Sequence, residues 1–187
     1  MTVPSTKALG PYDRYAIWVQ GCLRKCHGCI SEESWDLNGG YIVDTEELVN
    51  DIMQTSGIEG ITISGGEPFL QSEALVELIR KVKDKCDYGV ILYTGHKYEE
   101  IKSDVLAELC DIIIDGEYIE ELNDDLSLRG SSNQNIFYIT NRYSDITVNL
   151  YGEKGRKIEL HFYNNQSVMV GIPEIKCLEI FNKEGDS

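Results

Sequence analysis

Three cysteines that stand close together form the most reactive group of residues in the sequence. Cys22, Cys26 and Cys29 follow the spacing C-x3-C-x2-C. Three thiolates this close can hold three irons of a 4Fe-4S cluster, whose usual complement is four cysteines. The fourth iron then has no local protein ligand, so the spacing favours a cluster with one open coordination position.

A zinc site or a chance grouping is the alternative interpretation of the same cysteines. A structural zinc site has four closed ligands, and His27 stands between the second and third cysteines, where reaching the same ion would be awkward. A fourth zinc ligand would have to come from a distant residue, namely His96, His161 or Cys177. The spacing alone leaves zinc open as a second possibility.

A second group that can bind a ligand is the stretch Ser64-Gly65-Gly66-Glu67-Pro68, which directly follows an apolar run. Two glycines let the backbone approach a ligand without interference from Cβ atoms. The carboxylate beside them can accept a hydrogen bond from an ammonium group. A Gly-Gly pair at a strand end is also common as a simple turn, so this stretch by itself supports either interpretation.

Short apolar runs are predicted to form the strands that position both groups. They are nearly continuous in Ile, Val and Leu, as in strands buried on both faces of a parallel sheet, and cover residues 58–64, 88–94 and 110–115. An earlier strand is predicted over residues 15–21. Both ligand-binding groups therefore follow strands, where the loops of parallel α/β sheets build their sites.

Segments with helical periodicity lie between these strands. They cover residues 48–53, 74–82 and 101–109. Asp44, with Glu47 three residues later, is a start signal for the first of them. The resulting β-α alternation predicts an α/β domain with right-handed crossovers.

After about residue 140 the hydrophobic period changes to two. Apolar and polar residues alternate in three short runs, over residues 146–150, 158–162 and 168–172. Such alternation is typical of an antiparallel meander with one solvated face. We therefore divide the chain into a site-bearing domain, residues 1–140, and a small β-meander extension, residues 141–187.

Charge and hydropathy narrow the classes of partner. The 187 residues include 17 Lys and Arg against 32 Asp and Glu, a net charge of −15, which repels nucleic acids and anionic membrane surfaces. No stretch approaches the ~18 consecutive apolar residues of a membrane span, and the N-terminus lacks the apolar segment of a signal peptide. We therefore expect a cytoplasmic protein with no nucleic-acid or membrane partner.

The acidic run over residues 117–125 is a solvated surface or a docking patch for a basic partner or a reductant.

The two motifs together resemble those of the radical S-adenosylmethionine (SAM) superfamily, with the cysteine triplet after the first strand and Gly65-Gly66-Glu67-Pro68 after the second. Residues 10–137 are similar to the activating enzymes of anaerobic ribonucleotide reductase, which are glycyl radical enzyme activases. The matching residues are Gly10-Pro11, Arg14, 18–22, Trp35, 62–69, 93–95, Asp115-Gly116 and 129–134.

This resemblance implies a fold, a set of site residues and a reaction. The fold is an incomplete (β/α) barrel, here with a C-terminal antiparallel β extension. The cysteines would ligate a 4Fe-4S cluster, whose open iron binds SAM, and the cofactor-binding residues would be Ser64, Gly65, Gly66, Glu67, Thr94 and Asp115. A flavodoxin- or ferredoxin-type reductant would supply an electron that cleaves SAM to methionine and a 5′-deoxyadenosyl radical, which places a glycyl radical on a partner enzyme.

Three features depart from the family pattern. Tyr12-Asp13 stands where the family usually continues Gly-Pro-Gly, His27 replaces a common proline, and the meander is absent from the minimal activase. These departures keep open a stand-alone radical SAM enzyme that acts on a peptide or small molecule. A metal-stabilised interaction module is disfavoured because it has no need for the Gly-Gly-Glu stretch. The polar stretch over residues 129–134 is a ligand site, a docking site or only a turn.

Overall fold

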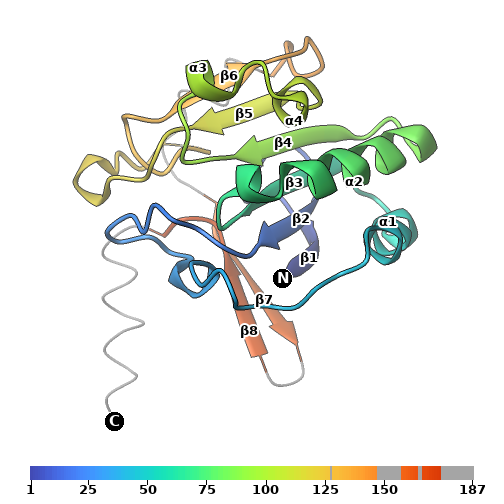
Figure 1. Cartoon of the computed structure of the whole chain (residues 1–187), viewed down its shortest axis with the longest axis horizontal. Coiled ribbons are helices and arrows are strands. Elements are labelled where there is room, and N and C mark those ends of the chain that lie inside the picture. The colour runs from blue at the N-terminus through green and yellow to red at the C-terminus, as the bar shows by residue number, and fades with distance from the viewer. Residues whose placement is uncertain (127, 147–156, 164–165, 174–187) are drawn as a thin grey trace.

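The computed structural model describes residues 1–126, 128–146, 157–163 and 166–173 (Figure 1). They form a mixed α/β fold with a six-stranded sheet and a separate two-stranded sheet. The strands of the large sheet lie side by side in chain order: β1 (Thr2–Thr6), β2 (Arg14–Val19), β3 (Gly60–Gly65), β4 (Gly89–Tyr93), β5 (Ile112–Asp115) and β6 (Asn135–Tyr138). This sheet is not closed, and β1 and β6 form its edges.

The four central strands are the ones that the apolar runs predicted. Strands β2, β3, β4 and β5 pair in parallel, whereas β1 and β6 pair antiparallel at the edges. In β4 and β5 almost every residue is buried, in agreement with coverage of both faces. Strand β1 was not predicted, because it is an edge strand that contains Pro4 and has little hydrophobic periodicity.

The helices begin close to where the periodicity predicted, with one interruption. Asp44 caps α1 (Thr45–Gln54) by accepting from the backbone N–H groups of Glu46 and Glu47, as expected, and α2 (Ser72–Lys85) follows β3. The single helix predicted over residues 101–109 is wrong. Two short helices, α3 (Tyr98–Ile101) and α4 (Val105–Glu108), replace it because the Asp104 carboxylate accepts from the N–H of Leu106 at 2.8 Å and starts a new helix.

Apolar side chains pack against both faces of the large sheet. The helices pack against one face, in a core that includes Ile17, Ile63 and Leu92. The opposite face packs against other segments, with Tyr143 over Ile91 and Ile112 in one cluster. A second cluster on that face joins β1 and β2 to the small sheet.

The small sheet is a hairpin of β7 (Glu159–Tyr163) and β8 (Gln166–Val170), seen beside β1 in Figure 1. It confirms the predicted strands over residues 158–162 and 168–172, whereas the run over residues 146–150 lies outside the described residues beyond residue 146. The hairpin packs through Val168 and Val170. Leu160 and Phe162 are instead 47% and 78% exposed. The apolar residues of β7 therefore lie on the solvated face, contrary to the expectation that alternation marks the packed face.

Among the described residues, no helix has the length and apolar character needed to cross a membrane.

Candidate metal and cofactor site

A cavity of about 710 Å³ lies at the carboxyl ends of the parallel strands. Its lining includes the loop after β2, here called the cysteine loop (residues 20–31), and the end of β3, here called the glycine turn (residues 64–67). The lining contains most of the predicted site residues and several of their neighbours. They include Cys22, Arg24, Cys26, Cys29, Ser64, Gly65, Gly66, Glu67, Thr94, Gly95, Gly116, Glu117, Tyr118 and Gln134.

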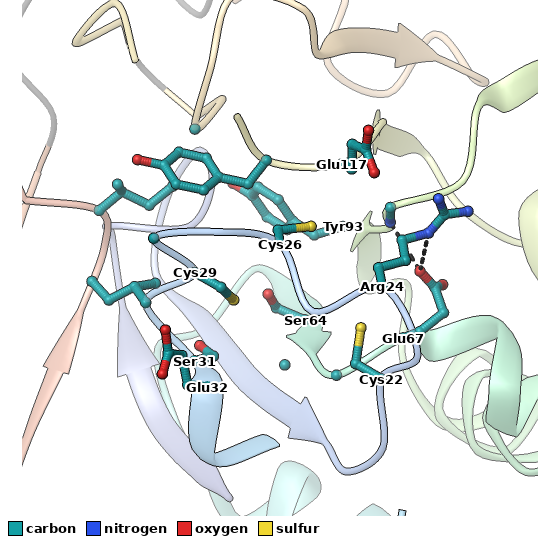
Figure 2. A pocket seen from close by; sticks show the side chains of 18 of the residues that line it. Cys22, Arg24, Cys26, Cys29, Ser31, Glu32, Ser64, Glu67, Tyr93 and Glu117 are labelled. Carbon is teal, nitrogen blue, oxygen red and sulfur yellow. Dashed lines mark hydrogen bonds and ion pairs between the residues drawn. The ribbon is translucent and has the colours of Figure 1, made fainter. Parts of the chain in front are cut away.

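The three predicted cysteine ligands border this one cavity. All three are free thiols and partly buried, and Figure 2 shows their sulfur atoms turned toward the same space near Ser64. Backbone hydrogen bonds hold the loop, because the N–H of Cys22 donates to the Trp35 carbonyl at 3.1 Å and that of Cys29 to the Cys26 carbonyl at 3.2 Å. The loop therefore presents three sulfur ligands together.

The surroundings of Cys26 and Cys29 favour the protonated thiol. Burial raises the pKa of Cys26 and of Cys29 above the ordinary value, and neighbouring cysteines raise both pKa values further. Because iron binds thiolates, loading the site must release protons. A positively charged metal centre supplies the energy for that release.

The donor set fits a cluster better than a single zinc ion. Among the residues that the structure describes, no three Cys, His, Asp or Glu side chains are placed to coordinate one metal ion. A cluster gives each thiolate its own iron, whereas a zinc ion requires four ligands to converge. The candidate histidines pair elsewhere, His96 with Glu100 and His161 with Glu159, and Cys177 lies outside the described residues.

The glycine turn is joined to the cysteine loop by its backbone. The N–H of Gly66 donates to the Val19 carbonyl at 2.8 Å, and the N–H of Glu67 donates to the Gly21 carbonyl at 2.7 Å. A Cβ atom on Gly66 would lie 2.2 Å from the Gly21 carbonyl oxygen. Only glycine fits here, so the two motifs are packed against each other without an intervening side chain.

Glu67 is buried, at 4% exposure, and its carboxylate is already hydrogen-bonded within the chain. Oε1 accepts from the Thr94 hydroxyl at 2.7 Å, and Oε2 accepts from the Gly95 N–H at 2.9 Å. Arg24 Nε lies 3.8 Å from Oε2 (Figure 2). Glu67 therefore joins the ends of β3 and β4. An ammonium group that bound this carboxylate would share it with the Thr94 hydroxyl and the Gly95 N–H.

Arg24 was not predicted as a site residue. It lies in the cysteine loop between the first two cysteines, and its side chain covers Gly95, where a Cβ atom would approach Arg24 Cδ to 2.2 Å. Nothing in the local sequence distinguishes it from an exposed basic residue. Its position depends on contact between the loops after β2 and β4, which are far apart in the sequence.

Asp115 does not reach the cavity lining, unlike the other predicted site residues. It is 2% exposed, and its carboxylate accepts from the backbone N–H of Tyr98 at 2.8 Å and from that of Asn135 at 3.0 Å. The next residues in the chain, Gly116 and Glu117, do line the cavity. Asp115 thus holds the segments around the site, and its role in binding the cofactor stays a prediction.

The polar stretch over residues 129–134 both forms a turn and borders the cavity. Gln134 Oε1 accepts from the N–H of Gly130 at 2.7 Å, and its Nε2 donates to the Gly116 carbonyl at 2.6 Å. Gly130 and Gln134 are both lining residues. The two interpretations of this stretch, a turn and part of a site, are therefore compatible.

Two further findings concern the rim of the cavity. His27, which replaces the family's proline, has an 86% exposed side chain and lies 3.1 Å from Glu120 through Nδ1. Residues of the extension also line the cavity, namely Met169, Ile172 and Pro173. No local sequence pattern predicts this contact, because alternating apolar residues indicate only a strand.

Comparison with known proteins places these features in one family pattern. Residues 8–137 match the family described as 4Fe-4S single cluster domain. The chain is 33% identical over 133 residues to the anaerobic ribonucleoside-triphosphate reductase-activating protein of Enterobacteria phage T4, covering 68% of this chain and 85% of that protein. The protein of the same name from Vibrio cholerae is 32% identical over 141 residues, covering 70% and 91%.

A second type of activating enzyme is also similar. The pyruvate formate-lyase 1-activating enzyme of Escherichia coli is 31% identical over 134 residues, which cover 66% of this chain and 53% of that enzyme. The matched region of this chain contains the cysteine loop and the glycine turn.

Proposed function

Because the chain belongs to the 4Fe-4S single cluster domain family, among the radical SAM activating enzymes of glycyl radical enzymes, we propose that it installs a glycyl radical on an anaerobic ribonucleoside-triphosphate reductase. Its cofactors are a 4Fe-4S cluster and SAM. The relatives with 85% and 91% of their length covered are activating proteins of that reductase, which favours it as the partner.

The bound cofactors supply the chemistry. With the cluster held by Cys22, Cys26 and Cys29, the bound cofactors would supply a 5′-deoxyadenosyl radical by one-electron cleavage of SAM, with methionine released. This radical would take a hydrogen atom from a partner glycine, giving 5′-deoxyadenosine and a glycyl radical. The contribution of this chain is to ligate, orient and exclude water. A flavodoxin- or ferredoxin-type protein would supply the electron.

One observation carries the proposal: the cysteine loop and the glycine turn border one cavity and are hydrogen-bonded to each other through the Gly21 carbonyl. Cys22, Cys26 and Cys29 would hold three irons and leave the fourth for SAM. Ser64, Gly65 and Gly66 offer backbone without bulky side chains at the place where the methionyl group of SAM would then lie.

Glu67 and Thr94 complete this proposed arrangement. Glu67 supplies negative charge toward the methionyl ammonium while its bonds to Thr94 and Gly95 fix the spacing of the two strand ends. Thr94, at the end of β4, would face the adenosyl side. We propose that the open sheet is an incomplete (β/α) barrel and that its open side admits a partner protein.

The test is anaerobic reconstitution with iron and sulfide. We expect about four irons per chain and a reduced-cluster electron paramagnetic resonance (EPR) signal that changes when SAM is added. With a reductant and the reductase encoded in the same genome, a glycine-centred doublet should form on the reductase, with 5′-deoxyadenosine in equal amount. Repeated consumption of SAM on a peptide or small molecule, with no radical left on a protein, would support the stand-alone enzyme instead.

A further inference from the structure

The hairpin of β7 and β8 contributes to the cavity although it lies outside the family-matched residues 8–137. We propose that this hairpin is a docking surface that guides an apolar segment with basic residues, carried by the partner reductase, to the mouth of the cavity. The inference rests on the proposed function, because it takes that partner as the occupant.

The hairpin has a defined position against the sheet. Val170 is fully buried and packs in one cluster with Val3, Leu9 and Ala16. The backbone N–H of Lys7 donates to Glu159 Oε1 at 2.8 Å. The first strand of the protein therefore anchors the hairpin, and the orientation of its other face follows from this packing.

That other face continues from the cavity to the solvent. Met169 lines the cavity and lies directly opposite Leu160 in the antiparallel pairing, so both side chains are on one face of the hairpin. Phe162 is two residues further along the same face. Leu160 and Phe162 are 47% and 78% exposed, so an apolar strip runs outward from the cavity wall.

The wall next to this strip belongs to the site. A Cβ atom on Gly130 would lie 3.0 Å from Ile172 Cδ1, so the segment after β8 contacts the polar stretch that borders the cavity. Single exposed apolar residues are common on proteins and need no explanation. Here they are aligned and continuous with a site whose substrate is proposed to be a protein, which is why we assign them a binding role.

The charge of the cavity lining indicates which kind of polypeptide segment can bind at its mouth. The lining includes carboxylates from two segments, Glu32 and Glu33 after the cysteine loop, and Glu117 and Glu120 after β5. The whole chain carries −15. A polypeptide with apolar side chains for the strip and basic side chains for the carboxylates is complementary, whereas an anionic polymer would be repelled.

The experiment uses the double variant Leu160→Ser/Phe162→Ser, with Val105→Ser as the matched control. Val105 is also apolar and 43% exposed, but it lies in α4 on the helical side of the sheet. We measure the reductase concentration that gives half-maximal glycyl radical, the binding of the metal-free protein to the reductase by interferometry, and SAM cleavage without reductase.

The double variant should raise the half-maximal reductase concentration and the dissociation constant by about tenfold, the scale for truncation of apolar interface anchors. SAM cleavage without reductase should be unchanged, and the control should match the wild type. Higher ionic strength should weaken binding of the wild type. Because Phe162 is mostly exposed, Phe162→Ser alone keeps the test valid if the double variant is unstable.

The outcomes separate this inference from the function on which it rests. Normal radical installation by the double variant, at wild-type reductase concentrations, would overturn the docking surface and leave the activase intact. Absence of a radical on the reductase with the wild type, despite SAM cleavage, would overturn both. A wild-type dimer in solution that the double variant dissociates would identify a second copy of the chain as the occupant and also overturn the proposal.

Discussion

The amino ends and the carboxyl ends of the parallel strands differ in how their polar groups are paired. At the amino ends, Arg14 is completely buried and every nitrogen of its guanidinium group donates. Its acceptors are Thr62 Oγ1, Glu59 Oε2, the Tyr143 hydroxyl and the carbonyls of Pro11, Ile61 and Gly89. At the carboxyl ends the cysteines are free thiols that face a cavity.

The difference shows how one sheet separates stability from chemistry. A buried charge must be fully paired to be tolerated, and the Arg14 network satisfies that requirement while it ties three strands and Tyr143 together. The carboxyl ends keep their reactive groups on loops, where substitution does not disturb the core. Changes at the two ends should therefore affect different measurable properties.

The largest expected effect is a complete loss of iron binding on replacing Cys22, Cys26 or Cys29 by Ser. Each thiol is proposed to ligate one iron, so the cluster should fail to assemble and activation should be abolished. The unfolding free energy of the metal-free protein should change by only about 0.5 kcal/mol. Iron analysis and urea denaturation measure the two properties. Retention of a full cluster by any of these variants would contradict the ligand assignment.

The next largest effect is expected at the other end of the sheet. Arg14→Met should lower the unfolding free energy by about 3 to 5 kcal/mol, because Glu59 and several buried acceptors lose their partner. Arg80→Met, on an exposed position of α2, is the control and should change it by less than about 0.5 kcal/mol. Equal denaturation midpoints for the two variants would show that the Arg14 network does not stabilise the fold.

Two truncations test how far the site-bearing domain extends. The predicted boundary after residue 140 would remove Tyr143, whose hydroxyl contacts both Arg14 and Glu59, whereas ending the chain after residue 146 retains it. Loss of this buried aromatic residue should cost about 3 kcal/mol. Both truncated proteins should still bind iron if the extension is a separate layer. Loss of iron binding in a folded protein ending at residue 146 would show that the extension belongs to the site.

Glu67→Ala should have the smallest effect on cluster assembly and a selective effect on SAM binding. It should leave the cluster intact but weaken SAM binding by about 1.5 to 3 kcal/mol, the range for a hydrogen bond to a charged group. Glu73→Ala, at an exposed position of α2, is the matched control. Titration with SAM, followed by the EPR signal of the reduced cluster, measures the SAM affinity of both variants. Undiminished affinity would remove Glu67 from the cofactor site.

Local patterns were sufficient to predict the parallel strands and the two motifs. Continuous apolar runs identified β2 to β5, and the predicted cysteines and glycines line one cavity. Contacts between distant segments could not be predicted in this way. The pairing of Arg24 with Glu67 and the orientation of the hairpin depend on the packed fold. The Asp104 cap that divides α3 from α4 is local, but the hydrophobic period of residues 101–109 does not indicate it.

The close contact between Gly66 and the Gly21 carbonyl also limits how this sequence can vary under selection. In a library randomised at single glycines and selected for cluster-dependent activity, position 66 should return only glycine, because the smallest added carbon has no space. Gly57 has a φ of +82° with nothing within 4 Å of an added Cβ, so Asn should survive there as well. Codon variability at these two positions would thus distinguish a glycine kept for space from one kept for its backbone angle.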